Sequence, residues 1–166
     1  KMPAKKSDES KLAKLKKEYK KFQEKYDLPS FNELNENFGV EKAAEVETDF
    51  TIREIRKQIS EKAYNYLRFV ETLINPVSAP MSIMTLVKTF GVEEKERLTD
   101  VYKKLMKNEL QLVSVDIEYS EKKEADFIKN TNKIWKEIQK DFLEVIKAVE
   151  KSWEEKAPDK NRKYFG

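Results

Sequence analysis

The side chains available for chemistry are carboxylates and amines, because the sequence contains no histidine and no cysteine. This composition excludes thiol nucleophiles, disulfides, Cys/His zinc sites and the Ser-His-Asp arrangement. Glu118, Glu121 and Glu124 are candidate oxygen ligands for Mg²⁺ or Ca²⁺. Acidic residues in the first turn of a helix also simply complement its dipole, which is the reading we favour. We therefore expect no catalytic residue, no metal and no cofactor.

The N-terminal segment is strongly basic. Up to Lys25 it holds ten lysines and four acidic residues, a local charge of +6, while the remainder of the chain carries −3. Lysine supplies charge without reading bases, so contact with phosphates would be independent of nucleic-acid sequence. The alternative is a solvated helix face. The candidate nucleic-acid-binding residues here are Lys11, Lys14, Lys17, Lys21 and Lys25.

Three of the five arginines lie in the central segment. Arginine suits planar recognition of phosphate and carboxylate groups, so a groove for RNA or a protein partner is the alternative to the ion-paired helix face that we favour. That face would hold local ion pairs, Arg53 with Asp49 and Arg68 with Glu71. The candidate groove residues are Arg53, Arg56, Tyr64 and Arg68.

Residues 113–119 change the periodicity of the sequence from that of a helix to that of a strand. Apolar and polar residues alternate there, which indicates an extended segment. No second strand-like run exists to pair with it, so it is either a connector that covers helices or a strand that pairs with the same segment of a second copy. The candidate oligomer interface consists of Val113, Val115, Ile117 and Tyr119.

Capping signals divide the chain before its central helix. Ser30 with Glu33, and Thr51 with Glu54, have the spacing of a capping box, which predicts a helix start at each place. Gly39 is a candidate left-handed cap that ends the first of these helices.

The core is expected on helices with apolar residues three and four positions apart. The central helix, which starts near Asp49 or Thr51 and runs to about Ile74, carries on its core face Ile52, Ile55, Ile59, Ala63, Tyr66, Val70 and Leu73. Residues 81–90 are apolar on nearly all sides, which predicts a helix in the centre of the fold or at an interface, and we expect it wedged into the core. The last helix begins near Ser120 and would extend about 50 Å along the bundle.

Together these elements predict a single all-α domain, a bundle of five or six helices with two long helices and one short extended segment. We divide it into a basic N-terminal arm or helix at 1–27, the helical bundle at 28–156, and a loose C-terminal tail at 157–166. The longest apolar stretch falls far short of a membrane span, and no signal region is apparent, so we expect a cytoplasmic protein without membrane contact.

Four segments carry a likeness to a known group: LPSFNELNENF, TDFTIREIRKQISEKAYNYLRF, NPVSAPM and IEYSEKKEADFIK. From about Leu28 to Trp153 the chain resembles an uncharacterised all-helical family of archaeal-type proteins. The resemblance implies an archaeal, cytoplasmic protein and assigns no activity and no site residue.

The sequence thus predicts a non-enzymatic helical interaction or scaffold protein whose partner is another protein or a second copy of itself. The alternative is a protein associated with nucleic acid or the ribosome through its lysine-rich N-terminal helix.

Overall fold

The structure is a computed structural model that describes the backbone of residues 4–156 and the side chains of residues 9–77 and 79–155. Six α-helices and two short 3₁₀ helices account for most of this range. They are α1 (Ala4–Tyr26), α2 (Phe31–Phe38), η1 (Val40–Glu45), α3 (Thr51–Ile74), η2 (Pro76–Ser78), α4 (Met81–Val87), α5 (Val92–Ile117) and α6 (Glu121–Lys156). The predicted all-α single domain is confirmed. The predicted tail at 157–166 lies outside the described residues.

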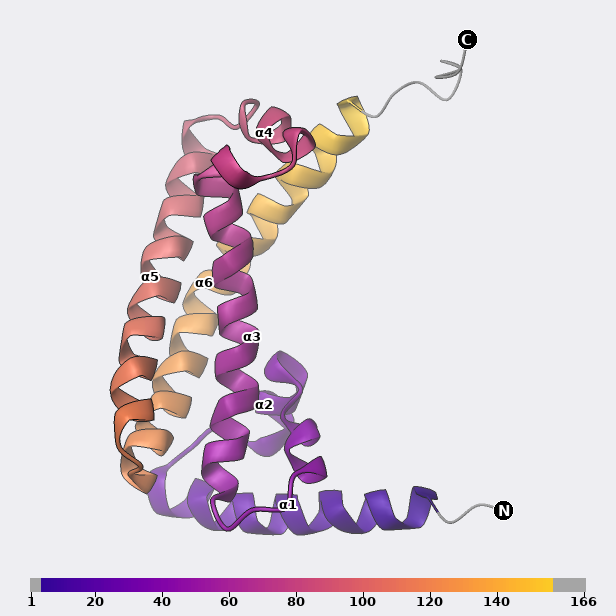
Figure 1. The fold of residues 1–166 in the computed structure, drawn as a ribbon, viewed down its shortest axis with the longest axis vertical. Coiled ribbons are helices and arrows are strands. Elements are labelled where there is room, and N and C mark those ends of the chain that lie inside the picture. Colours follow the sequence, from indigo (N-terminus) through magenta and orange to yellow (C-terminus); the bar gives the residue numbers. More distant parts are fainter. Residues whose placement is uncertain (1–3, 157–166) are drawn as a thin grey trace.

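Three long helices form the frame of the molecule. α3, α5 and α6 run side by side, α1 crosses one end of them, and α4 lies at the opposite end (Figure 1). α6 packs against both α5 and α3, and α2 packs against the lower part of α3. The frame has one more long helix than predicted, because residues 113–117, which were expected to be extended, belong to the helix α5.

The core follows the apolar face predicted for α3. Ile52, Ile55 and Ile59 are fully buried, and the face continues to Leu73 at the end of the helix. Leu15 and Tyr19 of α1 belong to the same core cluster, so α1 is docked on the bundle. Burial raises the pKa of the Tyr19 hydroxyl, which donates a hydrogen bond to the Pro29 carbonyl at 2.6 Å.

Two of the predicted helix signals are confirmed and one is wrong. The Ser30 hydroxyl accepts a hydrogen bond from the Glu33 amide at 3.2 Å, and Gly39 ends α2 with φ 67°. Phe50, not Thr51, is the N-cap of α3, and the Thr51 hydroxyl donates to Glu18 at 2.6 Å. A longer-range partner therefore replaces the local cap.

The prediction of a central apolar helix at 81–90 is wrong. α4 ends at Val87 and lies across one end of the bundle rather than inside it (Figure 1). A helix of seven residues is only about 10 Å long, too short to line a core of this length. Leu86 and Phe90 reach the core, whereas Met81 is 81% exposed.

The predicted extended segment is also wrong, because α5 runs without interruption to Ile117. A helix satisfies its backbone hydrogen bonds internally, which an unpaired strand cannot do. The burial pattern follows the helical period: Val115 faces the core while Val113 and Ile117 face solvent. A buried hydrogen bond of 2.7 Å from the Thr131 hydroxyl to Asn108 joins α6 to this half of α5.

Candidate interaction surfaces

The lysines of α1 do not form one uninterrupted cationic face. Lys17 and Lys21 are exposed and form no ion pair with any described side chain. Lys25 bonds Glu121 at 2.6 Å, which raises the pKa of Lys25 and lowers the pKa of Glu121. One of the five predicted phosphate contacts is thus already occupied by a carboxylate.

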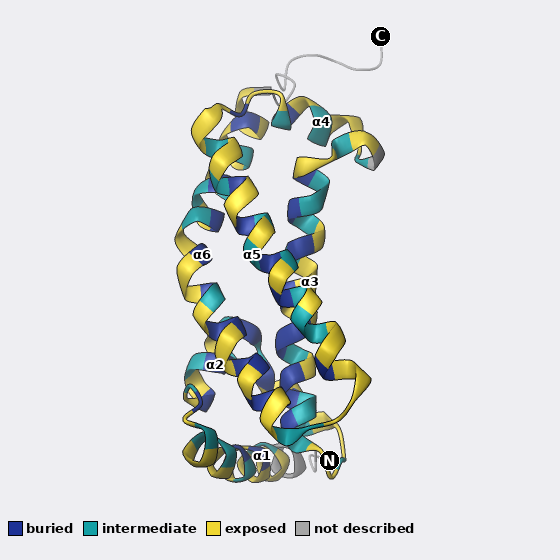
Figure 2. Ribbon diagram, turned by 90° about the vertical axis from the view of Figure 1, so that its left-hand side faces the viewer, coloured by how far each residue is buried: buried dark blue, intermediate teal, exposed yellow. Residues whose placement is uncertain are grey.

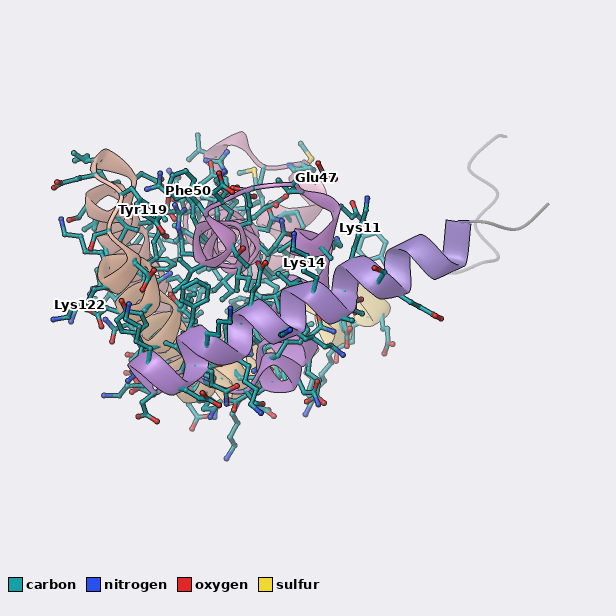
Figure 3. The ribbon with its side chains drawn as sticks, turned by 90° about the horizontal axis from the view of Figure 1, so that it is seen from below. Lys11, Lys14, Glu47, Phe50, Tyr119 and Lys122 are labelled. Carbon is teal, nitrogen blue, oxygen red and sulfur yellow. The ribbon has the colours of Figure 1, made fainter. Side chains whose placement is uncertain are left out.

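Lys11 and Lys14 border a hollow of about 520 Å³ between α1 and the segment before α3. Both lie on the side of α1 that faces Glu47 (Figure 3). Asp49 and Glu54 also line the hollow. These carboxylates weaken the positive potential of the two lysines and disfavour a phosphate there.

Arg53 and Arg56 belong to a buried ion cluster. Each carboxylate oxygen of Glu124, on α6, accepts a hydrogen bond from one arginine. Nε of Arg53 donates to Oε1 at 2.7 Å, and Nε of Arg56 donates to Oε2 at 2.6 Å. Arg56 also pairs with Asp116 at 2.7 Å, and Arg53 donates to the Val115 carbonyl at 3.3 Å. The cluster ties α3 to both α5 and α6.

The predicted arginine groove is not assembled as a surface. Glu124 is 0% exposed and Arg56 is 2% exposed, so neither can meet a partner. Tyr64 is exposed, and Arg68 bonds Glu71 at 3.5 Å, as the ion-pair interpretation predicted. The partners of Arg53 and Arg56 are remote in sequence, so local spacing gave no signal of them.

Apolar side chains form an exposed line on the outer face of α5. Among the predicted interface residues, Val113 is 54% and Ile117 81% exposed, whereas Val115 is buried. Leu110, which sequence reasoning missed, is 62% exposed. We call these three exposed residues, together with the half-buried Met106, which also packs against the core, the α5 stripe. No other described segment lies in front of α5 when it faces the viewer (Figure 2).

Two exposed aromatic residues lie at the end of the molecule where α5 finishes. Phe50 and Tyr119 meet edge to face, with ring centroids 4.6 Å apart, and the Arg53 guanidinium lies 5.0 Å from the Tyr119 ring (Figure 3). Tyr119 is the fourth predicted interface residue. It thus adds aromatic surface beyond the last residue of α5.

A second apolar surface, also missed by the sequence reasoning, is a groove of about 330 Å³ between α3 and α6. The rings of Tyr66 and Trp135 are stacked with their centroids 4.9 Å apart, and the ring of Phe142 meets that of Tyr66 edge to face with centroids 5.3 Å apart. The buried indole N–H of Trp135 donates to no described atom. Phe38 of α2 packs against Trp135 at 6.1 Å.

Within residues 4–156, no group of three or more acidic residues is placed to hold a metal ion. No helix in that range is both long and apolar enough to cross a bilayer.

No protein family, no curated protein and no solved structure matches this chain. The resemblance to an archaeal-type helical family therefore stays a prediction, and function has to be argued from the surfaces alone.

Proposed function

We propose that this protein is a non-enzymatic interaction protein that binds another helical surface through the α5 stripe. The observation that supports the proposal is the exposure of Leu110, Val113 and Ile117. With Met106 they are spaced four, three and four residues apart, the spacing of the seam between paired helices. A contiguous exposed apolar patch on a charged protein marks an interaction site.

An enzymatic role has less support. Among the described residues, Arg56 and Glu124 are buried charged groups that lie together, with the partly exposed Arg53 beside them, and both oxygens of the carboxylate are held by arginines. Because Glu124 is closed to solvent, it can neither meet a substrate nor exchange a proton with one. The cluster is better explained as a connection between α3 and α6.

The nucleic-acid alternative depends on α1. It predicts binding that weakens steeply with salt, because each neutralised phosphate releases counterions. Lys17 and Lys21 form no ion pair with any side chain that the structure describes, whereas Lys25 is paired and Lys11 and Lys14 border carboxylates. We therefore place the interaction function first.

The test is capture of partners from a lysate of the source cells by three baits: the wild-type chain, the double variant Leu110→Lys/Ile117→Lys, and the matched control Asn65→Lys/Asn130→Lys. Each variant adds two positive charges, but the control changes polar, exposed positions on α3 and α6. Circular dichroism confirms that all three are folded. We expect the stripe variant alone to lose partners.

If all three baits retain the same proteins, the proposed function is wrong. A nuclease-treated lysate adds a further comparison. Loss of every partner on nuclease treatment would favour the nucleic-acid alternative over the α5 stripe.

A further inference from the structure

We propose that the partner of the α5 stripe is a second copy of this chain, packed antiparallel so that α5 meets α5 across a two-fold axis. The proposal rests on the proposed function and names its partner. A two-fold interface uses the same patch on both copies, so the patch must complement itself. The α5 stripe satisfies this condition in one register.

That register places Leu110 opposite Val113 of the second copy, and Met106 opposite Ile117 of the second copy. The two-fold axis then passes between Gln111 and Leu112. All four members of the stripe gain an apolar neighbour. Alternating contacts of this kind are how two helices pack knobs into holes along a shared seam.

Neighbouring registers are worse. If the two helices are shifted by one heptad so that the contact moves toward the N-terminus of α5, Lys103 lies opposite Val113 of the second copy. This register is unfavourable because the ammonium group of Lys103 would lose its water without gaining a polar partner. A slide the other way sets Leu110 against Ser120 and leaves Met106 with no apolar contact. The sequence around the stripe therefore selects a single antiparallel alignment.

Charge favours the antiparallel over the parallel orientation. A parallel pair in register would bury the same four side chains but bring Lys103 against Lys103, which is repulsive. The antiparallel pair brings Lys103 to the carboxyl end of the other α5, where the helix dipole is negative. Glu118 also lies there: its side chain is 78% exposed, although it pairs with Lys123 of its own chain at 3.8 Å.

One contact opposes the arrangement. On one flank of the seam, Glu109 comes near Asp116 of the second copy, two residues beyond the directly opposite Ser114, and both residues are acidic. Within its own chain Asp116 pairs with Arg56 at 2.7 Å, which offsets its charge. The repulsion is therefore smaller than between two free carboxylates.

The surface around α5 has room for a second copy. In Figure 2 α5 lies in front of α3 and α6, and its exposed residues face outward. The stripe extends over about three turns of helix, so the interface falls at the small end of the range for specific association. We expect a reversible dimer whose fraction rises with protein concentration.

Disulfide formation tests both the partner and the orientation, because the chain contains no cysteine of its own. Leu110→Cys and Val113→Cys chains, one of them tagged, are mixed and oxidised mildly. A disulfide needs Cβ atoms about 4 Å apart, so it forms between residues that face each other. Asn130→Cys, an exposed position on α6, is the control for random collision.

The antiparallel pair predicts that the mixed disulfide between Leu110→Cys and Val113→Cys forms several-fold faster than either homodisulfide. Faster homodisulfides would indicate a parallel pair and overturn the proposal. Rates no higher than for Asn130→Cys would exclude a second copy as the partner. If the stripe variant still loses lysate partners in that case, the interaction function stands and only this inference fails.

Discussion

Two regions of the molecule reverse the usual distribution of residue types. In the ion cluster around Glu124, the charged side chains of Glu124 and Arg56 are buried, and along the α5 stripe, the apolar side chains of Leu110, Val113 and Ile117 are exposed. Both carboxylate oxygens of Glu124 are held by arginines, so the burial of charge is explained within the chain. The exposed members of the stripe have no such explanation. This difference separates a structural feature from the surface that we propose as an interface.

Val113 and Val115, two residues apart on α5, show the same contrast between an exposed and a buried environment. Both are valines on the same helix, but the first is exposed and the second is buried. An extended segment would place them on the same face, whereas a helix places them on nearly opposite faces. Substitutions at these positions therefore test the helix and the surface at once.

The largest effect is expected in the buried cluster. Glu124→Ala leaves the guanidinium groups of Arg53 and Arg56 without their shared carboxylate, so we expect the free energy of unfolding to fall by about 3–5 kcal/mol. Urea titration followed by circular dichroism measures it. Glu118→Ala, at an exposed position, is the control and should change stability by less than about 0.5 kcal/mol. Equal effects of the two substitutions would contradict the structural role of the cluster.

Substituting each of the two valines by lysine should have different effects: one substitution lowers the stability of the fold, and the other removes self-association. Val115→Lys places an unpaired charge in the core and is expected to cost about 3 kcal/mol of folding free energy. Val113→Lys should change the stability of the monomer by less than about 0.5 kcal/mol while removing self-association. Urea titration at low protein concentration checks the first effect, and mass in solution checks the second. If both variants unfold alike, the two valines do not lie on different faces.

A small stabilisation is expected at Glu109, which lies beside the stripe. Its pKa is raised, first by burial and then by Asp116 and Glu71. The folded state therefore holds the proton more tightly than the unfolded chain, and stability falls as the pH rises through this raised pKa. Glu109→Gln should add about 0.5 kcal/mol at pH 7, a value limited by solvent screening.

The gain from Glu109→Gln should disappear once the pH falls below the ordinary glutamate pKa of about 4.3, because both states of the wild type are then protonated. Thermal unfolding at several pH values measures it. A gain that does not depend on pH would show that charge at Glu109 is not the cause.

The sequence predicted the parts of the fold that depend on local patterns. The buried face of α3 follows from apolar residues three and four apart, and Ser30 and Gly39 cap α2 with chemistry that acts within a few residues. Residues 113–117 were misread because alternation over so few residues fits a strand and a helix equally well. Packing of α5 on α6 and α3 decides between them.

The candidate surfaces were less predictable. The lysines of α1 were identified by type, but the carboxylates beside Lys11 and Lys14 come from the segment before α3. The pairing of Arg53 and Arg56 with Glu124 spans about seventy residues, which no local spacing reveals. The exposure of Leu110 is likewise set by the helices around α5, since its residue type alone suggests burial.

The most direct test of the α5 stripe as an interface is sedimentation equilibrium of the wild-type chain and of Leu110→Lys/Ile117→Lys over a range of concentrations. We predict that the mass of the wild type rises from that of one chain toward that of two, and that the variant stays folded at the mass of one chain. The same mass for both proteins at every concentration would contradict self-association through α5.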